Sequence, residues 1–250
     1  MSRSSGEPAP DSAAAFDRRA VSVASLGEPL RRQLYRYVVA QDAPVSREQA
    51  AAGLGIALHA AKFHLDKLEH DGLLETDYRR PAGSGGPGAG RPAKVYRRSS
   101  AVIALSLPER RYDLVARVMA EAITTAAEQS VPLTESLRVA AGGIGRGLGK
   151  QVRPAGGRRS TVAEAQEVVR GVLAEVGFEP RPRGADTTLA NCPFSALAAD
   201  YTELVCGVNV ALVSGVLDGL AETRLQARLD PAPDRCCVTI CSRKKGQPGR

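Results

Sequence analysis

Apolar residues recur at helical spacing soon after a polar N-terminal stretch. Residues 1–25 are rich in Ser, Ala, Pro and charge and carry no regular apolar period, so we predict a disordered arm there. Three runs between residues 26 and 72 then show the spacing of amphipathic helices. The apolar stripes of the first and third runs are Leu30, Leu34 and Val38, and Ala61, Leu65 and Leu68.

The residues that bound these runs predict where each helix starts and stops. Ser46 has Gln49 three positions later, which is the spacing of a capping box that opens the second helix. Gly53-Leu54-Gly55 ends that helix, and Gly72 ends the third. A helix, a tight glycine turn and a second helix together predict a helix-turn-helix.

Two predicted strands follow, over residues 73–80 and 94–98, and residues 81–90 between them are too rich in glycine to be anything but a loop. Two strands joined by a long tip form a wing, so residues 26–100 are predicted to be a winged helix-turn-helix domain. No acidic residue accompanies the basic ones between positions 79 and 98, which are Arg79, Arg80, Arg91, Lys94, Arg97 and Arg98.

The rest of the chain predicts an α+β fold, with its own core because 250 residues exceed what one compact domain usually needs. Helical periodicity predicts a helical linker and dimerisation segment over 101–150, in which the helix of 108–129 supplies part of a homodimer interface. A linker at 153–159 leads to an α+β sensor domain over 160–242. We predict helices at 161–176 and 195–220 in it, and extended segments at 187–192, 224–229 and 236–242.

Composition adds three constraints. The formal net charge of +7 favours a polyanionic partner, although a modest basic excess is weak support for one by itself. Apolar residues make up 43% of the chain but aromatic residues only 4%, so the cores must be built mainly from Ala, Val and Leu. The sequence shows no hydrophobic signal segment or transmembrane stretch, so we expect a cytoplasmic protein without a membrane partner.

The third helix of the winged domain is the candidate DNA-reading element. A helix in the major groove needs outward side chains that reach base edges, and basic residues nearby that contact phosphates. Winged helices also serve as protein-binding modules, but an acid-free basic wing favours double-stranded DNA. His64 and His70 are interpreted as structural. The candidate DNA-binding residues are Ser46, His59, Ala60, Lys62, Phe63, Lys67, Arg79, Arg80, Arg91 and Lys94.

The chain has 5 cysteines, all in its last quarter, and in a reducing compartment clustered thiols favour metal or redox chemistry over disulfides. Cys192 precedes a proline, which fixes a turn suited to a cluster ligand. Cys206 falls on a helical apolar stripe, so it could equally be a buried core residue. No close Cys-x-x-Cys pair is present, which makes structural zinc less attractive.

Strand parity ranks the last three cysteines. Alternate strand residues face opposite ways, so Cys236 and Cys237 should not both point at one site. Cys236 shares its face with Val238 and Ile240 and is preferred, with Cys237 in reserve. Cys237 and Cys241 share a face but are separated by about 13 Å along an extended strand, so Cys241 is not expected to be a ligand.

Two sets of motifs carry family resemblances. The run 59–74, from His59-Ala60-Ala61-Lys62 to Gly72-Leu73-Leu74, followed by Gly90-Arg91-Pro92-Ala93-Lys94-Val95-Tyr96, resembles the ArsR/DeoR-type winged-helix regulators. Ala57 departs from the Ser or Thr that such regulators often carry, which removes a helix cap worth about 1 kcal/mol. Leu189 to Phe194, Glu203 to Gly207 and Asp234 to Ile240 are similar to the SufR-type repressors of iron-sulfur assembly operons.

The second resemblance implies a [4Fe-4S] cluster in a dimer. Its three ligands would be Cys192, Cys206 and one of Cys236 or Cys237. That family commonly has histidines shortly after the Cys-Pro-Phe element, whereas this chain has no His beyond His70. The fourth position is therefore left to Asp200, Glu203, an exogenous thiol or an open iron.

We consider two regulatory functions and, as a third class of function, an enzyme. The first is a DNA-binding regulator, of repressor type, whose operator affinity the cluster controls, and the second is the same DNA module with a thiol-redox or small-molecule sensor and no cluster. An enzyme is not favoured, because phosphate-binding and zinc-hydrolase motifs are missing from the sequence. The glycine run 142–147 follows a helical segment and is interpreted as a flexible helix end rather than a nucleotide loop.

Overall fold

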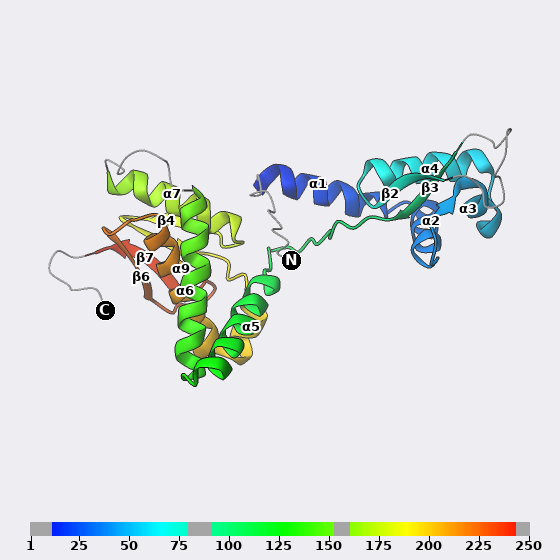
Figure 1. The fold of residues 1–250 in the computed structure, drawn as a ribbon. Coiled ribbons are helices and arrows are strands. Elements are labelled where there is room, and N and C mark those ends of the chain that lie inside the picture. Colours follow the sequence, from blue (N-terminus) through cyan, green and yellow to red (C-terminus); the bar gives the residue numbers. More distant parts are fainter. Residues whose placement is uncertain (1–11, 80–91, 153–160, 244–250) are drawn as a thin grey trace. The chain divides into compact units, whose positions relative to one another are not determined.

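The computed structural model describes residues 12–79, 92–152 and 161–243. The chain divides into two compact units, Met1–Leu105 and Ser106–Arg250, each with its own hydrophobic core. Helices and small antiparallel sheets are mixed in an α+β fold (Figure 1).

The N-terminal unit contains the predicted helix-turn-helix. Its helices are α2 (Pro29–Val39), α3 (Arg47–Leu54) and α4 (Leu58–His70). Gly55 caps α3 with a φ of 64°, a left-handed conformation that glycine adopts without steric cost. The apolar stripes pack together as expected, and the core consists mainly of Leu34, Val38, Ala50, Ala61, Leu65, Leu68, Leu74 and Tyr96.

The wing is an antiparallel sheet against these helices. Its strands are β1 (Val45–Ser46), β2 (Leu74–Arg79) and β3 (Ala93–Arg98), in the order β1-β3-β2. The register pairs Tyr78 with Lys94 and Thr76 with Tyr96. The even-numbered positions of β2 and β3 therefore share one face, the face on which Leu74 and Tyr96 enter the core.

The prediction of a disordered arm over 1–25 is wrong for its second half, because Ser12–Ser25 form helix α1. The Ser22 hydroxyl donates to the backbone carbonyl of Asp71 at 2.6 Å, and Ser22 and Ser25 are both buried. The segment is rich in Ala, a strong helix former. A helix held through two small serines has no stripe of large apolar residues, so its periodicity was not visible in the sequence.

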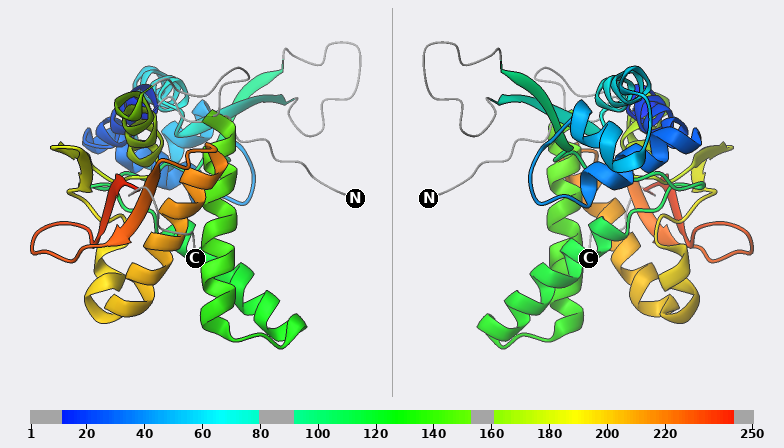
Figure 2. Two further views of the ribbon diagram at one scale, coloured as in Figure 1. Left: turned by 90° about the vertical axis from the view of Figure 1, so that its left-hand side faces the viewer. Right: turned by 90° about the vertical axis from the view of Figure 1, so that its right-hand side faces the viewer.

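The C-terminal unit opens with a helical hairpin of α5 (Tyr112–Gln129) and α6 (Leu133–Val152), seen in both views of Figure 2. The glycine run 142–147 lies in the middle of α6, so its interpretation as a flexible helix end is wrong. A Cβ built at Gly145 would overlap the carbonyl oxygen of Leu212 on the neighbouring helix. Gly145 is therefore needed where the two backbones touch, whereas a Cβ at Gly147 would meet nothing.

That neighbouring helix is α9 (Thr202–Gly219), which follows the short α8 (Ser195–Asp200). Glycines on both helices make the contact, because a Cβ at Gly215 would likewise overlap the carbonyl of Gly142. Of the described helices, α9 alone is long and apolar enough to cross a membrane. Leu212, Val213 and Val216 on it are fully buried, so burial in the core accounts for its composition.

A second antiparallel sheet lies beside α9 and α7 (Val162–Glu175) in Figure 1. Its strands are β4 (Pro180–Arg183), β5 (Asp186–Leu189), β6 (Leu225–Leu229) and β7 (Val238–Ser242), in the order β4-β5-β7-β6. The last strand begins only at Val238. Cys236 and Cys237 therefore precede it in irregular backbone, so the parity argument that preferred one over the other is wrong in its premise.

Candidate DNA interface and cysteine cluster

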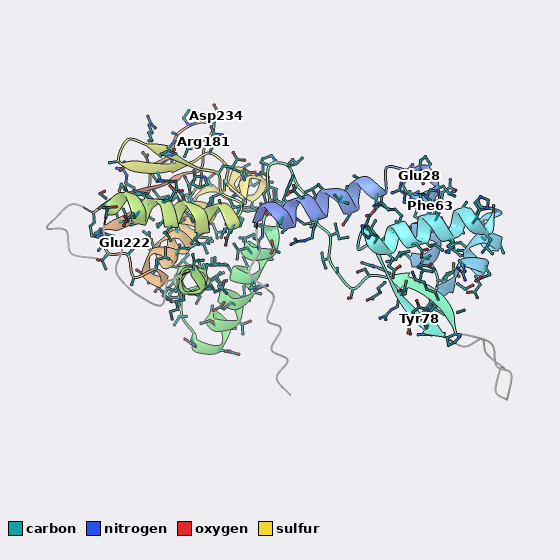
Figure 3. All side chains as sticks on the ribbon, turned by 90° about the horizontal axis from the view of Figure 1, so that it is seen from above. Glu28, Phe63, Tyr78, Arg181, Glu222 and Asp234 are labelled. Carbon is teal, nitrogen blue, oxygen red and sulfur yellow. The ribbon has the colours of Figure 1, made fainter. Side chains whose placement is uncertain are left out.

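The outward face of α4 carries the predicted reading residues. His59, Lys62 and Phe63 are exposed, and Ala60 is half-buried. Phe63 is 67% exposed (Figure 3), which is a large amount for a phenylalanine and suits contact with a thymine methyl. His64 lies inside this face, with its Nδ1 3.6 Å from a carboxylate oxygen of Glu28, in keeping with a structural role.

Lys94 has a different environment from the other candidate phosphate contacts. Its Nζ lies 2.9 Å from Asp66 Oδ1, donates to Glu69, and sits over the Tyr96 ring. Tyr96 also donates to Asp66, at 2.6 Å. Partial burial raises the pKa of Asp66, but the hydrogen bonds from Tyr96 and Lys94 outweigh it and leave that pKa below its usual value. Lys94 thus ties the wing to α4.

Lys67 and Ser46 also have partners inside the domain. Lys67 Nζ donates to Asp71 at 2.7 Å. The Ser46 hydroxyl accepts from the Gln49 amide, and the Gln49 side chain accepts from the Ser46 amide, which completes the predicted capping box. At the start of α4, Ala57 supplies no such cap.

Three basic residues of the wing line one hollow. Arg79 is exposed and, with Arg97 and Arg98, lines a hollow of about 350 Å³ beside the turn that contains Asp42. Arg97 and Arg98 belong to the basic wing predicted from the sequence but were not among the candidate DNA-binding residues. Arg80 and Arg91, which were also predicted to contact DNA, lie outside the described residues.

In the C-terminal unit, four of the cysteines come together from three separate segments. Cys192 lies in the loop between β5 and α8, Cys206 lies on α9, and Cys236 and Cys237 lie just before β7. The thiol of Cys236 lies close enough to Cys192 and Cys237 to shift the pKa of both, and the thiol of Cys206 likewise shifts the pKa of Cys237. All four thiols therefore form one connected group, which we call the thiol cluster.

Cys241 is not part of the thiol cluster. Its sulfur contacts the backbone oxygen of Gln226 at 3.8 Å, within the β6–β7 pair. Asp200 and Glu203, the carboxylates considered as a fourth ligand, are exposed. No contact of either with a cysteine is found among the described residues.

The environment of the thiol cluster divides its members into two kinds. The hydrogen bond from Cys236 lowers the pKa of Cys192 to about 7, and hydrogen bonds from Cys236 and Cys206 lower that of Cys237 to about 6. Burial raises the pKa of Cys206 to about 12, and hydrogen bonds to Cys192 and Cys237 raise that of Cys236. Cys192 and Cys237 are therefore the members of the cluster that ionise most readily, and the thiolate is the form that binds metals and reacts with oxidants.

Sequence reasoning missed Asn209, one turn of α9 beyond Cys206. It is fully buried, and its Nδ2 lies 3.4 Å from the sulfur of Cys192 and 4.0 Å from that of Cys236. Its Oδ1 is buried without a hydrogen-bond partner in the described part of the chain. An asparagine in the apolar stripe of a core helix was the available signal, since a buried amide needs partners.

The thiols as they stand do not form a metal-binding arrangement. Across residues 12–79, 92–152 and 161–243, no group of three or more His, Cys, Asp or Glu side chains is placed to hold a metal ion. The donor chemistry nevertheless fits a soft metal centre, because thiol sulfurs are soft ligands and a buried amide donates to two of these sulfurs. Donation from an amide favours sulfur in its thiolate form.

Comparison with known proteins identifies the N-terminal unit. Residues 26–77 match a family model described as a helix-turn-helix domain. No curated protein and no solved structure matches the chain. The matched residues are the ones that form α2, α3, α4 and the start of the wing. With an exposed reading helix and a basic wing on that domain, the chain is a DNA-binding transcriptional regulator with a winged helix-turn-helix.

Proposed function

We propose that this regulator is a repressor whose operator affinity is controlled by a [4Fe-4S] cluster held by Cys192, Cys206 and one or both of Cys236 and Cys237. The observation that carries the proposal is that the buried amide of Asn209 contacts the sulfurs of Cys192 and Cys236, which are remote in sequence. A cluster bound there would supply a redox-sensitive link among three segments of the C-terminal unit.

The roles of the residues follow from where each sulfur is attached. Cys206 is fixed on the core helix α9, whereas Cys192 and Cys236 lie in loops. Sulfurs on loops can shift by small backbone adjustments, and a sulfur on a helix packed by glycines cannot. Cys206 and Asn209 are thus the fixed side of the site, and the loops move relative to them when the thiolates gain or lose a partner.

Anaerobic reconstitution tests the proposal directly. Protein incubated with iron, sulfide and a reductant should become brown, absorb near 400 nm, and contain about four irons and four sulfides per site, as its stoichiometry requires. Cys192→Ala and Cys206→Ala should abolish that absorbance, and Cys241→Ala, a buried cysteine outside the thiol cluster, should retain it. Operator affinity measured with and without iron and sulfide should differ about 5- to 150-fold. Equal affinities would reject cluster control.

A thiol-redox regulator is the second candidate, favoured by the pairing of a low-pKa Cys192 with Cys236. The Cys192 thiolate would attack a peroxide, forming a sulfenic acid and releasing hydroxide. The Cys236 thiol would then displace water to form a disulfide, so the protein loses two hydrogens overall. Mass spectrometry after peroxide treatment would detect that loss, and a preparation that forms the disulfide but takes up no iron would favour this candidate.

We also propose that the protein works as a homodimer, since paired recognition helices read pseudo-palindromic operators. Support comes from apolar side chains that the α5–α6 hairpin leaves exposed: Tyr112, Ile123, Val131, Leu133, Val139 and Val152. Ile123 is 58% exposed although it shares a helix with the buried Leu114 and Val118. Ile123→Glu should therefore shift a dimer to monomer in sedimentation, and Arg117→Glu on the same helix is the control.

A further inference from the structure

The segment between the winged helix and α5 is anchored at its first end to the N-terminal unit. The backbone amide of Ser99 donates to the carbonyl of Leu73 at 3.2 Å. The side chain of Ile103 packs against the core of the winged helix. Residues 99–103 are therefore fixed to the DNA-binding domain and move together with it.

The other end of the segment is anchored to the loop that carries Cys192. Arg110 Nη1 donates to the side-chain oxygen of Asn191 at 2.5 Å and to the carbonyl oxygen of Cys192 at 3.2 Å. The Asn191 amide donates in return to the carbonyl of Glu109 at 3.0 Å. The backbone amide of Arg111 donates to the carbonyl of Pro193 at 3.1 Å. Each residue of the Asn191-Cys192-Pro193 loop is thus bonded to residues 109–111.

The Asn191 side chain that makes two of these bonds is shielded from solvent. Asn191 is 6% exposed, and its amide makes a second donation to the carbonyl of Gly177 at 2.7 Å. The guanidinium of Arg110 binds a side chain and a backbone carbonyl of one loop, a bond to a charged donor that is stronger than a neutral one. The Arg110 amide also donates to the Ser106 hydroxyl at 2.8 Å, which fixes the chain just before it.

We propose that Arg110 and Asn191 are positioning residues that transmit the chemical state of the thiol cluster to the winged helix. The inference rests on the proposed function, because it requires a state of Cys192 that changes. When the sulfur of Cys192 binds or loses a partner, its loop shifts, and residues 109–111 shift with it through these four hydrogen bonds.

The shift of residues 109–111 reaches the winged helix because the segment between the two anchors is short. Only residues 104–108 lie between the Ile103 anchor and the Glu109 anchor. Even fully extended, such a stretch spans at most about 18 Å. A short tether limits the positions that the winged helix can take, and paired recognition helices must keep the half-site spacing of an operator. A change in the state of Cys192 thus changes the range of spacings that the two recognition helices can take.

Two variants test the proposal by different means. Arg110→Met keeps the aliphatic stem and removes the bonds to the loop. Insertion of Gly-Ser-Gly-Ser between Leu105 and Ser106 leaves every bond in place and lengthens the tether. Exposed Arg117→Met on α5 is the matched control. The measured quantity is the ratio of operator affinities in two states of the protein, with reduced thiols and with iron and sulfide bound, and again with reduced and peroxide-oxidised thiols.

Both variants should take up the same iron and sulfide, or form the same disulfide, as the parent. Their affinity ratio should fall to within about 2-fold of one, from the 5- to 150-fold expected of the parent, and Arg117→Met should keep the parental ratio. Hydrogen exchange of the Arg111 amide should also become faster in Arg110→Met. A parental ratio in the insertion variant would overturn the inference. If the parent itself takes up no iron, the proposed cluster fails, whereas the thiol-oxidised ratio still decides the role of Arg110.

Discussion

Each unit of this protein contains one group of interacting polar side chains, and the two groups differ in whether all their members have partners. In the winged helix, Lys94, Tyr96, Asp66 and Glu69 form an ion-paired network on the back of the reading helix, and each charge has a partner already. In the C-terminal unit, the thiol cluster contains two cysteines whose pKa is lowered, Cys192 and Cys237, and Asn209 beside it has an amide oxygen without a partner in the described chain. Every charge of the first arrangement has a partner, whereas the second contains a buried acceptor without one in the described chain.

The surroundings of each group match that difference. The ion-paired network joins α4 to β3 by side chains, which fixes the orientation of the reading helix in the free protein. The thiol cluster instead joins two loops to α9, and α9 is held to α6 by direct backbone contact. Under the proposed function, a DNA-binding helix of fixed orientation would respond to a site that has one fixed and one adjustable side.

The largest effect is expected where α6 and α9 touch. Gly145→Val should destabilise the C-terminal unit by about 3 kcal/mol or more, because its side chain meets the carbonyl of Leu212 in a contact that has no room to relax. Gly147→Ala on the same helix meets nothing and should be neutral or stabilise by about 1 kcal/mol. Thermal unfolding of both variants measures the difference. Equal melting temperatures would mean that the close contact is not needed.

The second prediction separates bracing from DNA contact in the winged helix. Lys94→Met leaves Asp66 and Glu69 without their cation, so it should cost about 1 to 2 kcal/mol of stability, with the pairs partly exposed to solvent. Lys62→Met, at an exposed position on α4, removes only a weaker charge interaction with Asp66 and should cost at most about 0.5 kcal/mol.

Both variants should weaken operator binding, but only Lys62→Met should lower the salt dependence of that binding, as expected for the loss of a phosphate contact. Urea unfolding and binding at several salt concentrations give both quantities. A stable Lys94→Met protein with a reduced salt slope would return Lys94 to the role of a phosphate ligand.

How far the sequence predicted these two regions follows from their construction. Leu34, Val38, Leu65 and Leu68 lie on regular stripes, and regular stripes of large residues indicate helices from the sequence alone. The capping box at Ser46 and the turn at Gly55 are equally local. The N-terminal unit was therefore predictable to within a few residues, apart from α1.

The C-terminal unit was predicted less well because its decisive contacts are not local. Cys236 and Cys237 were assigned to a strand, and only the actual start of β7 at Val238 shows that both sulfurs can join one group. Gly145 looks like a helix breaker until its partner Leu212 is known. Asn209 becomes interpretable only when the sulfurs beside it are seen.

A third, smaller effect concerns pH. Burial raises the pKa of Asp71, but hydrogen bonds from Lys67 and Ser25 outweigh it, so the folded-state pKa lies below the unfolded value. The stability this gives is therefore present above the unfolded pKa, about 3.9, and is lost as the pH falls through the folded pKa.

Asp71→Asn should accordingly destabilise the winged helix at pH 7 and flatten its loss of stability below about pH 4. Asp42→Asn, at an exposed site, is the control. Chemical denaturation at pH 7, 4 and 3 measures the slope. An unchanged slope in Asp71→Asn would mean that Asp71 titrates alike in the folded and unfolded chain.

The smallest expected effect is a gain, rather than a loss, in the stability of the winged helix. Ala57 occupies the N-cap position of α4 with extended backbone and no side-chain acceptor, so the first amides of the reading helix lack the cap that Ser46 gives α3. Ala57→Ser should stabilise the winged helix by about 0.5 to 1 kcal/mol, and Ser46→Ala should destabilise it by about 1 kcal/mol. Because the reading helix is already held by Lys94 and Tyr96, this gain should leave operator affinity within about 2-fold. A larger change in affinity would show that the first turn of α4 frays in the free protein and becomes ordered on DNA. The ion-paired network would then not be sufficient to order the whole of α4 before DNA binds.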